Sequence, residues 1–157
     1  MLNKNIKLKS MYKVDTSENS IKIQCGASFE EAERMCKDVN GFIRKNDILK
    51  EYEFAISLGL REMVNNALDY GSDSEEANVI KMQLLYNNEK LKIVMKDEGQ
   101  GFDWRKRQLK IEIENIDPLE VGGKGLYLLE KYFDSMYFND KGNQITVEKN
   151  IQDKDKT

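Results

Sequence analysis

Three short stretches of this sequence combine acids, an amide and glycines at spacings that could do chemistry. The first, LREMVNNALDYG at positions 60–71, places Glu62 and Asn66 four residues apart. On a helix this spacing puts both side chains on one face, which also carries the small residues Ala55 and Gly59 in the preceding turns. Such a face could line a cavity, and the alternative is the solvated edge of a helix.

The second stretch is DEGQG at positions 97–101, which directly follows the strand-like run LKIVMK. A carboxylate just beyond a buried strand, here Asp97, can accept a hydrogen bond from an amine. Glycines at 99 and 101 let the backbone turn and come close to a ligand. The alternative is a glycine-rich turn that contains acids by chance.

The third stretch, VGGKGLYLLEKYF at 121–133, has Gly122, Gly123 and Gly125 immediately before or at the expected start of a helix. Free backbone amides and the positive end of a helix suit a phosphate, and Lys124 adds a point charge. The stretch is neither a Walker A loop nor a dinucleotide-binding fingerprint, because the required surroundings are missing. The alternative is a flexible glycine hinge.

The composition limits the chemistry that these residues can take part in. The 157 residues fit a single domain, with a net charge of -3 and no concentrated basic block that would indicate nucleic acid binding. The chain has no histidine, which excludes Ser-His and Cys-His catalysis, histidine-ligated zinc and phosphohistidine relays. Acid–base chemistry must therefore use carboxylates, Lys, Tyr or Cys.

The cysteines and the apolar runs favour a cytoplasmic protein. Cys25 and Cys36 lie far apart in the sequence and form no metal-binding pattern, as expected of reduced thiols. No apolar run approaches the length needed to cross a bilayer, and the first residues lack the apolar core of a signal peptide. We therefore expect no membrane association.

The first half of the chain predicts one strand and two helices. IKIQC at 21–25 alternates as a strand does, and a further strand is expected within residues 1–20. Ser28 and Glu31 fit a capping box that opens a helix to about Arg44. A second helix is expected over about Leu49–Asp69, with Gly71 as its stop signal. Their buried faces are predicted to contain Cys36, Val39, Phe42 and Ile43 in the first helix, and Ile56, Leu60, Met63, Val64, Ala67 and Leu68 in the second.

The second half predicts two hairpins separated by a loop and a helix. Strands at 78–86 and 90–97 form the first hairpin, and strands at 134–139 and 143–149 form the second, with a turn at DKGN. Residues 101–122 read as a long loop with a short helix, followed by a helix at Gly123–Phe133. We therefore predict an α+β two-layer sandwich with helices on one face of a mixed, mostly antiparallel sheet, a core at about 20–149 and a flexible tail at 150–157.

Taken in order, the three stretches read E-x-x-x-N-A on a helix, D-x-G-x-G after a strand, and G-x-G-L opening a helix. This order resembles the GHKL ATPase superfamily of gyrase, Hsp90, histidine kinase and MutL type, over about residues 20–149. The short forms EMVNNALDYG, DEGQGF and GGKGLYLLEKYFD are most similar to the anti-sigma factor serine kinases. The resemblance implies a Bergerat-type ATP-binding fold and phosphorylation of a serine on a small antagonist protein.

The resemblance also implies roles for particular residues. Asn66 corresponds to the asparagine that binds Mg²⁺ held by the ATP phosphates, which suits the preference of magnesium for oxygen ligands. Glu62 corresponds to the acid that serves as general base or orients the acceptor hydroxyl. Asp97 corresponds to the carboxylate that accepts a hydrogen bond from the adenine amino group.

The glycines are implied to shape the pocket and a mobile lid over it. Gly99 and Gly101 correspond to glycines of the adenine pocket and lid hinge. The lid itself would span about 103–122. The G-x-G-L motif that ends it, where amides meet the phosphates, corresponds to Gly123, Lys124, Gly125 and Leu126.

Two positions depart from the family pattern. Tyr70 stands where these kinases often have histidine, and Val121 stands where the family often carries a basic residue that helps to hold the terminal phosphate. The cations that could replace the missing one are Lys124, Arg105, Lys106 and Arg107. The departures therefore leave kinase activity less well supported by the sequence than nucleotide binding.

Three functions remain open at this point. The leading one is an ATP- and Mg²⁺-dependent serine/threonine kinase that binds a small protein partner, an antagonist or a sigma factor, with homodimerisation as a further expectation from the resemblance. A catalytically weak nucleotide-binding module that switches partner affinity is the first alternative. The second is an interaction domain that binds no nucleotide.

Overall fold

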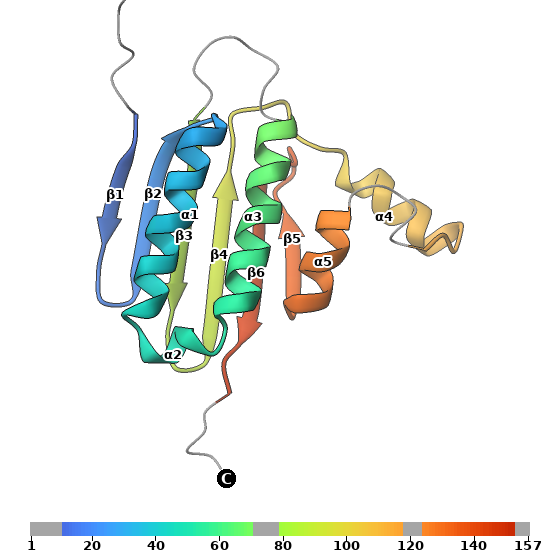
Figure 1. The fold of residues 1–157 in the computed structure, drawn as a ribbon. Helices are drawn as coiled ribbons and strands as arrows, with labels where there is room; N and C mark the ends of the chain where they lie inside the picture. The colour runs from blue at the N-terminus through green and yellow to red at the C-terminus, as the bar shows by residue number, and fades with distance from the viewer. Residues whose placement is uncertain (1–10, 71–78, 118–123, 153–157) are drawn as a thin grey trace, which may run out of the picture.

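The computed structural model describes residues 11–70, 79–117 and 124–152. Their strands form one six-stranded sheet in the order β1-β2-β3-β4-β6-β5 (Figure 1), and every neighbouring pair is antiparallel. The antiparallel pairing therefore extends to the whole described sheet, and the predicted α+β sandwich is confirmed. The strands are β1 Lys13–Thr16, β2 Ser20–Gly26, β3 Val79–Tyr86, β4 Lys90–Lys96, β5 Ser135–Phe138 and β6 Gln144–Asn150.

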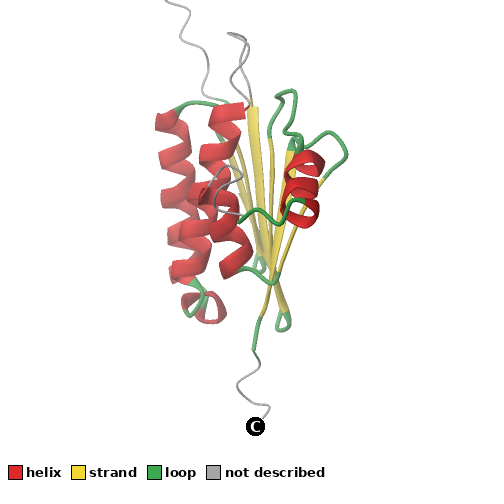
Figure 2. Ribbon diagram, turned by 90° about the vertical axis from the view of Figure 1, so that its right-hand side faces the viewer, coloured by secondary structure: helices red, strands yellow, loops and turns green. Residues whose placement is uncertain are grey.

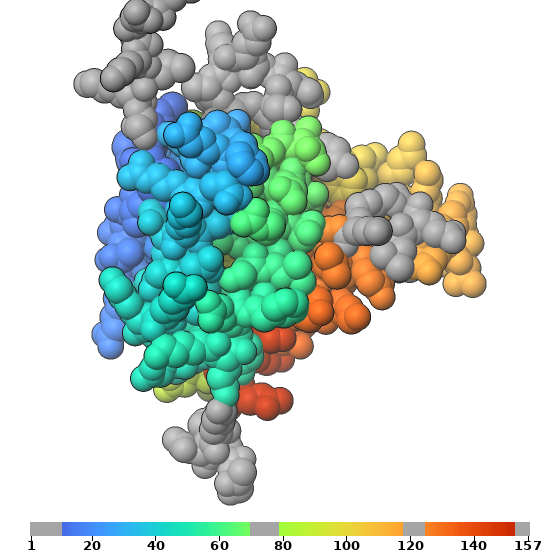
Figure 3. Space-filling view, viewed as in Figure 1, coloured from blue at the N-terminus to red at the C-terminus, as the bar shows by residue number. Residues whose placement is uncertain are grey.

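The helices form the second layer of the sandwich. The long helices α1 (Phe29–Arg44) and α3 (Glu53–Tyr70) lie side by side against one face of the sheet (Figure 2), and α5 (Lys124–Tyr132) packs on α3. Helix α4 (Trp104–Ile113) stands out from the body beyond α5 (Figure 3). Among the described residues no helix is both long and apolar enough to span a bilayer.

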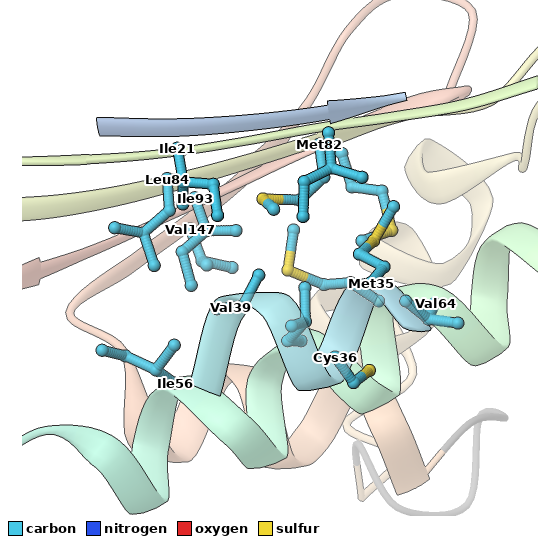
Figure 4. Close-up of a cluster of buried hydrophobic side chains, with 14 of the residues drawn as sticks. Ile21, Met35, Cys36, Val39, Ile56, Val64, Met82, Leu84, Ile93 and Val147 are labelled. Carbon is cyan, nitrogen blue, oxygen red and sulfur yellow. The ribbon is translucent and has the colours of Figure 1, made fainter. Parts of the chain in front are cut away.

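The core lies between the sheet and helices α1 and α3. In β4, every second side chain faces the helices, as the period of two in a strand requires. These side chains are Leu91, Ile93 and Met95, and they are at most 2% exposed. Ile93 pairs with Leu84 on one side and Val147 on the other, so apolar side chains form a continuous row across the sheet (Figure 4). Burial of each such side chain stabilises the fold by about 1.5–3 kcal/mol relative to exposure.

The start of α1 confirms one half of the predicted capping box. The Ser28 Oγ accepts a hydrogen bond from the Glu31 N–H at 3.2 Å. The Ser28 N–H donates to the Gly26 carbonyl oxygen at 2.9 Å, and the Glu31 carboxylate accepts from the N–H of Gly26, so it joins the helix start to the end of β2. The predicted buried face of this helix is confirmed, since its members are at most 9% exposed: Cys36, Val39, Phe42 and Ile43.

The second predicted helix, about Leu49–Asp69, is wrong in its first turn. The structure has a single turn, α2 (Asp47–Lys50), and then a separate α3 that begins at Glu53. Leu49 and Ile56 are both fully buried, and their spacing of seven residues would also place them on one face of a straight helix. Apolar periodicity therefore does not reveal the break between the two helices.

Residues 101–122 contain more helix than expected. Within the described part of this segment, α4 has ten residues, and Asp103 Oδ1 caps it by accepting from the Lys106 N–H at 3.2 Å. Its apolar residues Leu109 and Ile113 are 53% and 75% exposed. The helix has no buried apolar stripe, which is why the sequence did not define its length.

Both cysteines are buried, free thiols. Burial raises the pKa of the Cys25 thiol to about 12 and also raises the pKa of Cys36. Because the thiolate is the reactive form of cysteine, these two side chains act as apolar core residues rather than as nucleophiles.

The contrast between two isoleucines tests where the stability of the fold resides. Ile93→Ala removes a fully buried side chain and should lower the free energy of unfolding by about 2–5 kcal/mol. Ile113→Ala makes the same change at a 75% exposed position and should alter it by less than about 0.5 kcal/mol. Urea denaturation followed by circular dichroism measures both, and equal effects would contradict this placement of the core.

Candidate functional site

A pocket lies where α3, the end of β4, the start of α5 and the turn between β5 and β6 meet. It encloses about 100 Å³, less than the roughly 300–1,000 Å³ typical of sites for drug-sized ligands. The pocket as it stands therefore fits part of a larger ligand. Its lining residues are Met63, Asn66, Ala67, Met95, Asp97, Phe102, Arg107, Leu126, Phe138, Gly142, Asn143, Gln144 and Ile145.

The two polar residues of the first motif lie on α3, as predicted. Asn66 lines the pocket. Glu62, one turn earlier, lies against the start of α5, because a Cβ added to Gly125 would be 2.6 Å from Glu62 Oε2. The acid of the first motif thus touches a glycine of the third motif, and any side chain at position 125 would displace it.

The small residues Ala55 and Gly59 do not line this pocket. A Cβ added to Gly59 would lie 2.5 Å from a ring carbon of Phe133. The suggestion that they form a cavity wall is therefore wrong for Gly59, which instead allows α3 to pack closely against the end of α5. Close packing of these helices brings the first and third motifs together.

Asp97 is held at the edge of the pocket by Asn143. The Asp97 N–H donates to the Asn143 carbonyl oxygen at 3.0 Å, and Asn143 Nδ2 donates back to the Asp97 carbonyl oxygen at 3.0 Å. The Asp97 side chain accepts from the N–H of Gly99 at 2.7 Å. Burial raises the pKa of the Asp97 carboxyl, opposed by the Gly99 hydrogen bond and by the positive charge of Lys141.

A second asparagine orients the first. Asn139 Oδ1 accepts from the N–H groups of Gly142, Asn143 and Gln144 at 2.8, 3.0 and 3.1 Å, and its Nδ2 donates to Asn143 Oδ1 at 2.7 Å. The sequence predicted this turn but not its function in holding Asp97. The available signal was a pair of asparagines that flank a short polar turn, which also occurs in ordinary turns.

The glycines at 101 and 142 allow two backbone segments to touch. Both have positive φ, +91° and +78°, and the Phe102 N–H donates to the Gly142 carbonyl oxygen at 3.1 Å. A Cβ at Gly101 would lie 1.9 Å from the Lys141 carbonyl oxygen, and one at Gly142 would lie 2.0 Å from that of Phe102. Only glycine fits such a crossing without strain.

Helix α4 is anchored to the same turn. Trp104 Nε1 donates to the Asn139 carbonyl oxygen at 3.0 Å, and its ring stacks on Phe138 with centroids 6.1 Å apart. Arg105 pairs with Asp140 at 2.8 Å. These contacts place the next turn of the helix, with Arg107, at the pocket.

The third motif is described only in part. Gly122, Gly123 and Val121 lie outside the described residues, as do the side chains of Lys124 and Tyr70. Lys124 begins α5, Gly125 is buried against Glu62, and Leu126 is 5% exposed and lines the pocket. Four cations could substitute for a basic residue at position 121. The structure places one of them, Arg107, in the pocket wall. The sequence did not distinguish Arg107 from the other three.

Comparison with known proteins identifies the domain. Residues 26–149 match the family model of the histidine kinase-like ATPase domain. The chain belongs to this family. It is also similar to the serine-protein kinase RsbW of Staphylococcus aureus strains JH9 and Newman, with 28% identity over 146 residues that cover 88% of this chain and 91% of each relative.

Family membership confirms the GHKL resemblance that the three motifs suggested, and it agrees with the observed antiparallel sheet and its helical layer. It implies that this is an ATP-binding domain.

The raised pKa of Asp97 predicts that its charge costs stability in the absence of a ligand. Asp97→Asn keeps an oxygen for the Gly99 N–H and removes the buried charge, so the variant should be more stable than the wild type at pH 7. The folded pKa lies above the ordinary 3.8, so this advantage should fade as the pH falls through the folded value toward 3.8. Urea denaturation at pH 7 and pH 4 measures the difference.

The exposed Asp15→Asn is the matched control and should leave the free energy of unfolding nearly unchanged at pH 7. A wild type more stable than Asp97→Asn at pH 7 would mean that the Asp97 charge is compensated by its partners.

Proposed function

We propose that this chain is an ATP- and Mg²⁺-dependent protein serine/threonine kinase of the anti-sigma factor type. The observation that carries the proposal is the convergence of three motifs at one place. Asn66 and Asp97 line a single pocket, and Glu62 beside it touches Gly125 at the start of α5. The name serine-protein kinase carried by the relatives supports the reaction type.

At the base end of the site, Asp97 accepts a hydrogen bond from the adenine amino group. The Asn143 hydrogen bonds fix the backbone of Asp97, and the Gly99 N–H holds its carboxylate before ligand arrives, which reduces the entropy lost on binding. Gly99 and Gly101 supply the close backbone approach. The apolar lining from Met63, Met95 and Leu126 suits the faces of a base.

At the phosphate end, the start of α5 supplies the backbone amides of Lys124 and Gly125 and the positive end of the helix dipole, and Gly123 is proposed as a further donor. Asn66 ligates Mg²⁺. The described part of the chain has no group of three or more His, Cys, Asp or Glu side chains that could hold a metal by themselves. Magnesium binding would therefore depend on phosphate oxygens, as is usual for this ion in nucleotide sites.

Glu62 is the proposed general base. Its carboxylate, next to the start of α5, accepts the proton of a serine hydroxyl as the serine oxygen bonds to the terminal phosphorus of ATP. The bond between that phosphorus and the bridging oxygen breaks, and ADP leaves. Phosphoryl transfer requires mainly positioning and charge neutralisation, which a site without histidine can provide.

The substrate in this proposal is a small antagonist protein, and a sigma factor is a second partner. Residues 103–122, which include α4, act as a lid over ATP, with the protein in the cytoplasm and able to form homodimers. The support for these partners is the similarity to RsbW, which covers 88% of the chain.

A catalytically weak nucleotide-binding module is the second candidate. Val121 and Tyr70 favour it, because they replace a basic residue and a histidine that related kinases often have. In this case ATP would switch the affinity for a partner without meaningful transfer of phosphate.

Calorimetric titration with ATP, with and without Mg²⁺, tests the nucleotide site. The wild type should bind ATP more tightly with Mg²⁺, and Asp97→Ala should lose about 10–150-fold in affinity, because it removes a hydrogen bond to a charged group worth about 1.5–3 kcal/mol. Asp15→Ala, at an exposed position, is the control. No binding by the wild type alone or with its partner would overturn the proposal.

Glu62→Gln separates the kinase from the module. The amide keeps the shape of the side chain but cannot take a proton, so transfer of labelled phosphate to the antagonist should fall by about 10²–10⁴-fold while ATP affinity stays near the wild-type value. Glu53→Gln makes the same change in the first turn of α3 and should remain active. Undiminished regulation of the partner by Glu62→Gln would favour the module.

A further inference from the structure

One buried side chain in the pocket wall has unmet hydrogen-bonding capacity. Arg107 of α4 is only 9% exposed, although α4 is otherwise mostly exposed. Its Nε and Nη2 have no hydrogen-bond partner, and among the described residues no other buried side-chain nitrogen or oxygen is in that state. Since buried polar groups in folded proteins are nearly always paired, we expect these two atoms to donate hydrogen bonds to an acceptor.

The third nitrogen of the guanidinium is already engaged. Arg107 Nη1 donates to Glu130 Oε1 of α5 at 3.2 Å, in an ion pair whose acid is 38% exposed. This contact ties α4 to α5 and pairs the positive charge, but it leaves the Nε and Nη2 donors without acceptors. Buried donors without acceptors are costly, so a ligand that supplied the missing acceptors would bind favourably there.

The free atoms are well arranged for an oxyanion. Nε and Nη2 share one edge of the planar guanidinium, so they can donate two nearly parallel hydrogen bonds to two oxygens of one group. This bidentate arrangement is the reason that arginine is preferred at phosphate and carboxylate sites. The pocket that Arg107 lines is the one that also contains Asn66 and Asp97.

Its neighbours on the helix are placed differently. Arg105 is exposed and pairs with Asp140, and Lys106 is exposed. The anchor of Trp104 on Asn139 and Phe138 sets the rotation of the helix, and with it which of the three consecutive cations enters the pocket. The burial of Arg107 is therefore a consequence of how α4 is docked.

We propose that Arg107 is a phosphate-binding residue of the ATP site, whose Nε and Nη2 donate to the phosphate chain of the nucleotide. It supplies from α4 the cation that is absent at Val121. This inference rests on the nucleotide site proposed above, and it assigns the phosphate contact to a residue 14 positions earlier in the chain.

The test compares ligands with and without phosphates. ATP, ADP and adenosine are titrated into the wild type and Arg107→Ala by calorimetry. Arg107→Ala should bind ATP and ADP about 10–150-fold more weakly, the range expected for hydrogen bonds to a charged group, and adenosine within about twofold of the wild type, since adenosine carries no phosphate.

Two further variants control for charge and folding. Lys106→Ala removes the same charge from an exposed neighbour on α4 and should bind ATP within about twofold of the wild type. Arg107→Lys keeps the charge and most of the volume but loses the two-nitrogen edge, so its ATP affinity should lie between those of the wild type and Arg107→Ala. Circular dichroism confirms that each variant is folded.

The outcomes separate this inference from the proposal on which it rests. If the wild type binds ATP and the folded Arg107→Ala variant binds it equally well, Arg107 does not contact phosphate and the ATP site stands. If adenosine loses as much affinity as ATP, Arg107 contacts the base and the inference is wrong. If the wild type binds none of the three ligands, the nucleotide site and this inference fail together.

Discussion

The candidate site depends on the hydrogen bonds that join the end of β4 to the turn between β5 and β6. β4 and β6 are paired as far as Lys96 and Gln144, and the reciprocal Asp97–Asn143 bonds continue the pairing by one residue. This contact fixes the backbone of Asp97, which lines the pocket. It also fixes the start of the segment that passes the contact between Gly101 and Gly142 and then continues into α4.

A second constraint is the distance between α3 and α5. Gly59 lets the ring of Phe133 approach α3 closely, and Gly125 leaves room for the Glu62 carboxylate at the same interface. Two glycines, 66 residues apart in the sequence, thus bring the proposed base to the helix start that is proposed to receive phosphates. The packing of α3 against α5 therefore also determines where the site residues lie.

Two polar groups with unfavourable surroundings lie at this site. Asp97 has a pKa raised by burial, and Arg107 has two unpaired nitrogens. The sheet–helix core, by contrast, is built from fully buried apolar side chains such as Ile93 and Leu84. Natural proteins commonly break the rules of polar burial at functional sites and compensate elsewhere, and the large apolar core of this domain offers that compensation.

The sequence alone determined the α+β class, the apolar faces of the two long helices and the three motifs, because periodicity, caps and glycines act over a few neighbouring residues. Tertiary structure decided what depends on the docking of distant segments. It divided the predicted second helix in two, assigned Asn143 to hold Asp97, and selected Arg107 over its neighbours Arg105 and Lys106 for the pocket. Those three cations are adjacent in the sequence, and only the anchoring of α4 on the β5–β6 turn determines which one is buried.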